Sequence, residues 1–299
     1  MKALVSGATG LVGRYIVETL LDAGYEIVIG GRTRPADDLF PAPLEFRWLS
    51  LAPESDHSAL FTGIDVFIHA AFEHLPGRYR GGEGDDPEGF RRANLDGTVS
   101  LFEAAGLAGV QRVVFLSSRA VYDGLPHGKP LTEGLELQPT SLYGDIKLRG
   151  EQALAAMNSV GFTTSSLRLT GVYGELRPNK WDRLFDNYLA GRKIQARAGS
   201  EVHGHDVGQA VRLMLETDAA LVGGQTFNVS DLIADTRSIL TPLHQILPYP
   251  PDLPPSADKT AVAEMDTQKI KKLGSNPGGQ KLFEETLQRL ITQFPATRA

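Results

Sequence analysis

The sequence predicts an α/β fold in which a doubly wound parallel sheet is joined to a smaller C-terminal α/β lobe. Short apolar runs alternate with longer segments of helical periodicity through the first 173 residues. These apolar runs are unbroken, which is typical of parallel strands that helices cover on both faces. After Tyr173 the alternation stops and the chain becomes more polar. The change of pattern predicts a second, smaller unit.

The first strand and helix are separated by a glycine-rich turn, and Gly24 closes that helix. Gly106 and Gly161 lie just past two later helices, and Pro139 precedes one of them. The expected strands are Leu4–Ser6, Glu26–Ile29, Asp65–Ala70, Arg112–Ser117, Thr163–Leu169 and Gln225–Val229. The expected helices of this part are Leu11–Ala23, Phe90–Ala105 and Thr140–Ser159.

Fewer elements are expected beyond Tyr173. The segment Gly174–Gly204 is polar and basic, and we expect one short helix in it. Five prolines in residues 248–255 indicate an extended stretch. The helices expected in this part are Trp181–Ala190, His205–Glu216 and about Lys281–Gln293.

The composition excludes several classes of protein. The chain has 299 residues and no cysteine, so it carries no disulfide, thiolate zinc site, iron–sulfur cluster or cysteine nucleophile. A net charge of −6 makes nucleic acid an unsuitable partner. No apolar run reaches the roughly 18 residues of a membrane span. We expect a cytoplasmic protein with no membrane partner and no metal site.

A glycine motif follows the first strand and opens the first helix. It reads Gly7-Ala8-Thr9-Gly10-Leu11-Val12-Gly13, with its glycines three residues apart. Gly7 suits a tight turn, Gly10 admits a pyrophosphate close to the backbone, and Gly13 lets the helix pack on the strand. The positive end of the helix then faces the phosphates. This context predicts a dinucleotide site, in preference to a plain strand–helix turn.

The second strand ends in Gly30-Gly31-Arg32-Thr33-Arg34. NAD sites usually place an acid here to bind the 2′-hydroxyl of the adenosine ribose. An arginine can instead bind a 2′-phosphate through two hydrogen bonds. The arginines therefore favour NADP over NAD. The alternative is that Arg32 and Arg34 are ordinary solvated charges.

Further motifs follow the glycine loop in chain order. They are Asp65–Ala71, Asn94–Thr98, Ser117–Tyr122, Tyr143–Lys147, Leu167–Gly174, His203–Val207 and Asp266–Gly274. With the glycine loop, these motifs make the chain resemble the extended short-chain dehydrogenases/reductases, the NAD-dependent epimerase/dehydratase family. The resemblance covers nearly the whole chain and implies a Rossmann-like fold, with residues 1–173 binding the dinucleotide, later returns near 205–230, and residues 174–299 forming mainly a substrate lobe.

The resemblance implies a catalytic set of Ser118, Tyr143 and Lys147. Spacing i, i+4 places the tyrosine and the lysine on one helix face. A free phenol titrates near ~10, and a nearby ammonium lowers that pKa. In the family, the tyrosine takes the proton of the substrate hydroxyl, the lysine also binds the nicotinamide ribose, and the serine binds the reacting oxygen. A surface tyrosine and lysine would be the structural alternative.

The expected binding residues extend beyond this set. Asn94 either braces its helix or a water near the lysine, or is a buried structural amide, and His69 is expected to be a satisfied core histidine. For the cofactor we expect Gly7, Thr9, Gly10, Leu11, Val12, Gly13, Arg32, Ser50, Leu51, Ala70, Ala71, Asn94, Ser117, Tyr143 and Lys147. For the substrate we expect Phe72, Ser118, Arg119, Tyr143, Thr170 and Tyr173.

These residues predict an oxidoreductase that moves a hydride between NADP, or alternatively NAD, and a secondary alcohol or ketone of a sugar or sugar-acid. A nucleotide-sugar epimerase with tightly bound NAD is the alternative, and a non-catalytic nicotinamide sensor ranks last because Tyr143 and Lys147 are both present. The family's dehydratases carry an acidic pair where this chain has Arg119-Ala120, which disfavours dehydration.

The substrate is expected to be a small molecule. Only 28 residues separate Gly174 from His203, which favours a smaller substrate than a nucleotide-sugar. Residues 177–197 hold six basic and two acidic side chains, which would suit an anionic substrate or form a solvated face. By resemblance alone, the helices carrying Asn94 and Tyr143 predict a homodimer.

Overall fold

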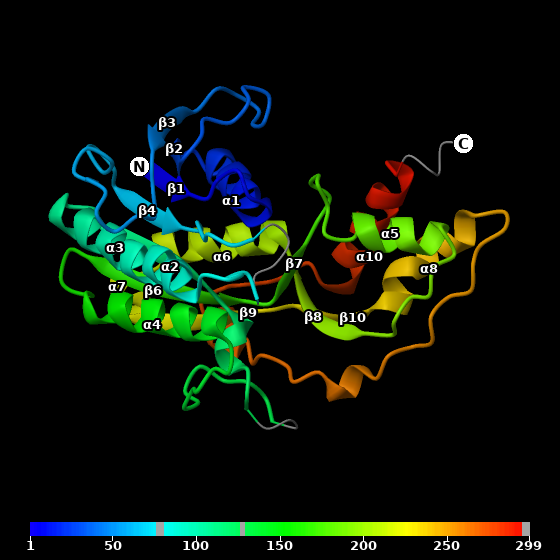
Figure 1. The fold of residues 1–299 in the computed structure, drawn as a ribbon. Helices are drawn as coiled ribbons and strands as arrows, with labels where there is room; N and C mark the ends of the chain where they lie inside the picture. The colour runs from blue at the N-terminus through cyan, green and yellow to red at the C-terminus, as the bar shows by residue number, and fades with distance from the viewer. Residues whose placement is uncertain (76–80, 126–128, 295–299) are drawn as a thin grey trace.

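The computed structural model describes residues 1–75, 81–125 and 129–294. Figure 1 shows a larger unit that holds the N-terminus and the main sheet, and a smaller lobe built around α5, α8 and α10. The strands β7, β8 and β10 lie between the two. Within the described ranges, no helix has the length and apolarity needed to cross a membrane. The arrangement confirms the predicted fold class.

Seven strands form the main sheet, in the order β3-β2-β1-β4-β5-β6-β9. Every neighbouring pair is parallel. The order reverses direction at β1, and ligands of open α/β sheets bind at the carboxyl ends of strands beside such a point. The strands are β1 (Lys2–Ser6), β2 (Glu26–Gly31), β3 (Glu45–Trp48), β4 (Val66–His69), β5 (Arg112–Ser118), β6 (Thr163–Leu169) and β9 (Gln225–Val229).

Helices cover both faces of this sheet. On one face, α1 (Leu11–Asp22) and α6 (Gly204–Glu216) bury an aliphatic stripe that includes Ile16 and Val211. On the other, α3 (Gly97–Leu107) and α4 (Leu142–Ala156) enclose a second core. The shorter elements are α2 (Pro87–Arg91), α7 (Ala219–Val222), α9 (Gln268–Lys271), a π-helical turn (Arg92–Asp96) and two 3₁₀ turns (Arg119–Tyr122 and Lys259–Ala261).

Two helices differ from the sequence prediction by three residues at one end. The expected helix Phe90–Ala105 begins earlier, at Pro87, because the Asp86 side chain accepts a hydrogen bond from the backbone of the first turn. It then passes through the π-helical turn before α3. The expected helix Thr140–Ser159 begins at Leu142, since the hydroxyl of Ser141 caps it.

The smaller lobe contains a strand that the sequence analysis missed. We expected only a helix in Gly174–Gly204, but this segment also holds β8 (Ala198–His203). Its sequence, Ala-Gly-Ser-Glu-Val-His, has no apolar run, so periodicity gave no signal. Instead β8 is defined by its neighbours, antiparallel β10 (Leu232–Asp235) and parallel β7 (Gly171–Tyr173). The helices α5 (Asp182–Leu189), α8 (Thr236–Ile246) and α10 (Gly279–Thr292) complete the lobe.

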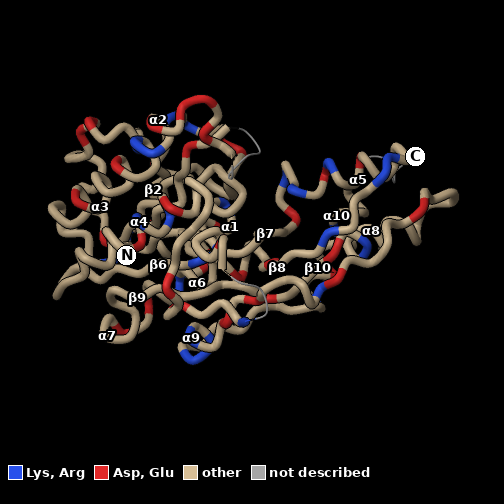
Figure 2. The backbone as a smooth tube through the Cα atoms, turned by 60° about the horizontal axis from the view of Figure 1, so that its bottom comes forward, with Lys and Arg blue, Asp and Glu red and all other residues tan. Residues whose placement is uncertain are grey.

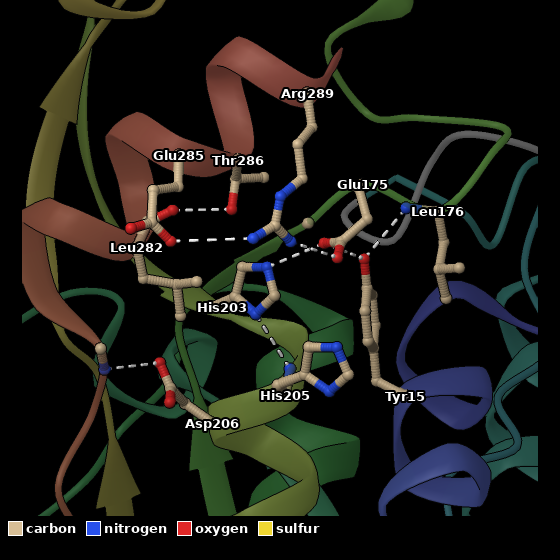
Figure 3. A network of polar contacts seen from close by, with 12 residues as sticks. Tyr15, Glu175, Leu176, His203, His205, Asp206, Leu282, Glu285, Thr286 and Arg289 are labelled. Atoms are coloured by element: carbon tan, nitrogen blue, oxygen red, sulfur yellow. Dashed lines mark hydrogen bonds and ion pairs between the residues drawn. The ribbon is translucent and has the colours of Figure 1, made fainter. Parts of the chain in front are cut away.

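A polar network joins the lobe to the larger unit (Figure 3). The carboxylate of Glu175 lies 3.0 Å from Nε2 of the fully buried His203. Nδ1 of this histidine accepts a hydrogen bond from the backbone nitrogen of His205, so Nε2 carries the ring proton. Nε2 therefore donates a hydrogen bond to Glu175. Tyr15 of α1 and Arg289 of α10 approach the same carboxylate at 3.3 Å. The hydrogen bond from His203 lowers the pKa of Glu175 to about 2.

The network predicts how Glu175→Gln changes stability. The free energy of unfolding should fall by about 1 kcal/mol at pH 7, because a half-buried carboxylate loses charge-assisted hydrogen bonds. The pKa is near 4.5 in the unfolded chain and about 2 in the folded one, so this contribution is complete above pH 4.5 and is lost as the pH falls toward 2. Urea unfolding at pH 7 and pH 3 measures it.

The exposed residue Glu136 provides the control. Glu136→Gln should leave the pH dependence of unfolding unchanged. An equal loss of stability for Glu175→Gln at both pH values would contradict the role given to its ionised form.

Candidate active site and cofactor loop

The glycine loop leaves β1 at the carboxyl edge of the sheet. Gly7 has a φ of +67°, which favours glycine. A Cβ on Gly7 would lie 2.7 Å from the backbone nitrogen of Ala71, and one on Gly13 would lie 2.2 Å from the carbonyl oxygen of Gly7. The first turn of α1 carries neither a side-chain cap nor an acidic residue. The loop and helix end therefore fit a bound pyrophosphate.

The loop after β4 lies directly against this turn. The hydroxyl of Ser6 accepts hydrogen bonds of 3.2 Å from the backbone of both Ala70 and Ala71. His69 is fully buried, and its ring nitrogens lie 2.7 and 2.9 Å from the hydroxyls of Ser6 and Thr98. Burial lowers the pKa of His69 to about 3. It is the satisfied core histidine that the sequence predicts.

At the end of the second strand, Arg32 follows β2 as expected. It is not an isolated charge, because it forms an ion pair of 3.0 Å with Glu73. Arg34 stacks over Phe46 instead. The hydroxyl of Ser50 accepts from the backbone of Ala52. The Leu51 side chain lies in the core, so it is not open to a ligand.

Strand β5 and helix α4 bring the three expected catalytic residues into one region. Lys147 is 4% exposed, and its Nζ donates a 2.8 Å hydrogen bond to the carbonyl oxygen of Leu116. Tyr143 lies one turn earlier, with its ring centre 6.0 Å from that nitrogen. Ser118 ends β5, and its hydroxyl accepts from the backbone of Ala120. Burial lowers the pKa of Lys147 to about 7, although the charge of Glu151 opposes the effect.

Phe72 and Asn94 complete the region. The ring of Phe72 packs edge-to-face on Tyr143 at 5.0 Å and lies 4.5 Å from Nζ of Lys147. The Asn94 carboxamide accepts from the backbone nitrogen of Glu73 and donates to its carbonyl oxygen, at 2.6 and 2.8 Å. It also donates to the carbonyl oxygen of Phe90. Asn94 is therefore a buried structural amide that fixes the loop after β4.

Known proteins resemble the chain over most of its length. A family model described as the NAD dependent epimerase/dehydratase family matches residues 3–230. The UDP-glucose 4-epimerase of Mycolicibacterium smegmatis is 30% identical over 265 residues, with 81% of each protein covered. The solved structure of MoeE5 in complex with UDP-glucose and NAD superimposes with a TM-score of 0.79 at 26% identity, covering 100% of both chains.

The chain belongs to the NAD-dependent epimerase/dehydratase family. This confirms the resemblance found in the motifs. The 3-beta-hydroxysteroid dehydrogenase of Mycolicibacterium neoaurum is also 30% identical, over 67% of this chain and 55% of that protein. The chain thus spans about half the length of that dehydrogenase.

Several side chains expected at the site of this family member instead contact other parts of the protein or are enclosed in it. The hydroxyl of Ser117 donates to the buried Glu151. Arg119 donates to the carbonyl oxygen of Ala263 at 3.0 Å. Thr170 is buried and bonds to the carbonyl oxygen of Ser200. Tyr173 is fully enclosed, with its ring stacked on Trp181, so its side chain is not open to a substrate.

The basic segment around α5 is partly neutralised. Figure 2 shows acidic residues among the basic ones on the segment that leads into α5. Arg177 pairs with Asp182, and Lys180 pairs with Glu201. Two of its six cations therefore have acidic partners, which weakens its attraction for an anion. Among the described residues, no three His, Asp or Glu side chains converge as metal ligands.

The sequence analysis did not single out Glu73 and Glu151. Glu151 lies four residues after Lys147, so the same helical spacing that linked Tyr143 to Lys147 gave a signal for it. No sequence pattern links Glu73 to Arg32, because they are 41 positions apart and meet only through the order of the strands. Residues 76–80 of the loop that follows Phe72 lie outside the described residues.

The buried amine predicts a pH effect on stability that Lys147→Met should remove. Between pH 7 and pH 10.5 the unfolded lysine holds a proton that the folded one releases. The wild-type free energy of unfolding should therefore rise with pH across this window, by up to about 1.4 kcal/mol per pH unit from this residue. Urea unfolding at pH 7, 8.5 and 10 measures the slope.

The control replaces Lys281, whose side chain is 87% exposed. Lys281→Met should keep the wild-type slope, whereas Lys147→Met should flatten it. Equal slopes in all three proteins would mean that the amine of Lys147 is not buried as the structure describes.

Proposed function

We propose that this protein is an NAD(P)-dependent oxidoreductase that acts on a secondary alcohol or ketone of a sugar or sugar-acid type. The observation that carries the proposal is the placement of Tyr143 one turn from the buried Lys147, at the sheet edge where the glycine loop begins. Family membership supports it, since the family includes enzymes that use NAD.

The chemistry assigned to the side chains is proton transfer and orientation. The Tyr143 phenolate takes the proton of a substrate hydroxyl, or, in the reverse direction, the Tyr143 phenol gives a proton to a carbonyl oxygen. The Lys147 cation favours the phenolate, and an anionic dinucleotide nearby would favour that cation at neutral pH. Ser118 donates to the same substrate oxygen. A bound nicotinamide supplies or accepts the hydride.

The glycine loop supports a dinucleotide. A Cβ at Gly7 or Gly13 would collide with backbone atoms, whereas a Cβ at Gly10 would meet only the carbonyl oxygen of Gly7, at 3.3 Å. We assign NADP as the preferred form, since Arg32 stands where NAD sites usually hold an acid. Solved relatives are complexed with NAD, so NAD is the alternative.

A nucleotide-sugar epimerase is the second candidate. The similarity to a UDP-glucose 4-epimerase over 81% of both chains favours it. The absorbance of reduced nicotinamide distinguishes the two candidate functions. It is followed with NADP⁺ and with NAD⁺, in the presence of aldoses, uronates, simple secondary alcohols and UDP- or dTDP-sugars. A rise with one substrate supports the oxidoreductase, and a changed sugar without a rise supports the epimerase.

The domain roles and the assembly complete the proposal. Residues 1–173 with the returns near 205–230 would bind the dinucleotide, and the remainder would bind the substrate. Two protomers would pair through α3 and α4, as the family resemblance suggests. Leu107, 91% exposed at the end of α3, is consistent with a covered surface there. Light scattering of the purified protein tests the dimer.

Replacing Tyr143 tests the chemistry directly. Tyr143→Phe should lower turnover by about 10²–10⁴-fold, because a general acid–base group is lost while the ring that packs on Phe72 remains. Dinucleotide affinity, measured by calorimetry, should change by no more than about tenfold, since the change corresponds to at most one hydrogen bond.

Tyr249→Phe is the matched control, because Tyr249 is 94% exposed and lies outside the site. It should keep full turnover. Retention of wild-type turnover by Tyr143→Phe would overturn the mechanism.

A further inference from the structure

An ion pair connects the ends of two strands that flank the glycine loop. Arg32 follows β2, and Glu73 follows β4. Strand β1 lies between β2 and β4 in the sheet, and the loop that starts at Gly7 leaves from β1. The Arg32–Glu73 contact of 3.0 Å therefore joins the two sides of the proposed dinucleotide groove.

Hydrogen bonds to its backbone fix the position of Glu73, the acidic partner. Asn94 bonds to both the backbone nitrogen and the carbonyl oxygen of Glu73. The preceding residue, Phe72, is packed on Tyr143 and Lys147. The carboxylate of Glu73 is thus held close to the position from which it contacts Arg32.

Both charged groups of the pair are exposed to solvent, so another ion can replace either partner. The Arg32 side chain is 68% exposed and the Glu73 side chain is 48% exposed. Exposed pairs of this kind contribute little to folding and are weakened by salt. A ligand anion that reaches Arg32 can therefore displace Glu73 without unfolding any element.

We propose that Glu73 sets the discrimination between NADP and NAD by competing with the ribose 2′-phosphate for Arg32. A 2′-phosphate carries negative charge, so it must take the guanidinium from the carboxylate and is repelled by that carboxylate. A free 2′-hydroxyl is uncharged and meets neither cost. The inference rests on the proposed function, which puts the adenosine ribose beside Arg32.

Binding by Glu73→Gln, followed by calorimetry, tests the inference without using activity. The probes are NADP⁺, NAD⁺, adenosine 2′,5′-bisphosphate and AMP. The variant should bind NADP⁺ and the bisphosphate about fivefold more tightly, and NAD⁺ and AMP within about twofold of wild type. The gain should shrink in 0.5 M salt, where the Debye length falls to about 4 Å.

Three further variants complete the experiment. Arg32→Gln should weaken NADP⁺ binding. In the double variant, which combines Arg32→Gln with Glu73→Gln, the second substitution should not tighten NADP⁺ binding, because Glu73 acts through Arg32. Glu216→Gln is the matched control, since Glu216 forms an exposed ion pair with Arg212 on α6. It should leave all four affinities unchanged. Circular dichroism verifies that each variant folds.

The outcomes separate this inference from the proposed function. If Arg32→Gln weakens NADP⁺ binding while Glu73→Gln changes nothing, or changes NADP⁺ and NAD⁺ equally, the role of Glu73 is wrong and that of Arg32 stands. If Arg32→Gln leaves NADP⁺ binding unchanged, the 2′-phosphate assignment fails, and the inference fails with it. If the wild type binds neither dinucleotide, the proposed function fails.

Discussion

The buried amine of Lys147 constrains how α4 lies on the sheet. Its nitrogen bonds to the carbonyl oxygen of Leu116, so the middle of α4 must touch β5. Gly150, one turn further, allows this approach, because a Cβ there would lie 3.0 Å from the ring of Phe115. With α4 fixed in this way, Tyr143 is held at the carboxyl edge of the sheet, near the end of β5. The candidate site is thus a consequence of helix–strand packing.

The segment after β4 links the two ends of the candidate site. Phe72 contacts Tyr143 and Lys147, and the next residue, Glu73, contacts Arg32. Asn94 holds the backbone between these contacts. Because adjacent side chains on this segment contact Tyr143 and Arg32 respectively, these two residues are connected by a single stretch of fixed backbone.

A buried polar network also supports α4, through Glu151, which lies one turn after Lys147 on the same face of that helix. Arg168 and Glu151 form an ion pair of 2.7 Å in which both side chains are about 95% buried. Removing one partner of such a pair costs about 3–5 kcal/mol, because the other charge is left unpaired. Tyr122 bonds to Arg168 and to Asn228, which extends the network to β9. Glu151 also raises the pKa of Lys147 against the effect of burial, so it tunes the amine as well as anchoring α4.

The sequence by itself determined the local features. Strand–helix alternation, the Gly7–Gly13 loop and the spacing of Tyr143 and Lys147 all follow from patterns within about one element, and such patterns reflect backbone geometry. Only the tertiary structure decided that Glu73 meets Arg32, that Asn94 holds Glu73 and that Tyr173 is enclosed. These contacts depend on strand order and on packing between elements far apart in the chain, and neither is encoded in local periodicity.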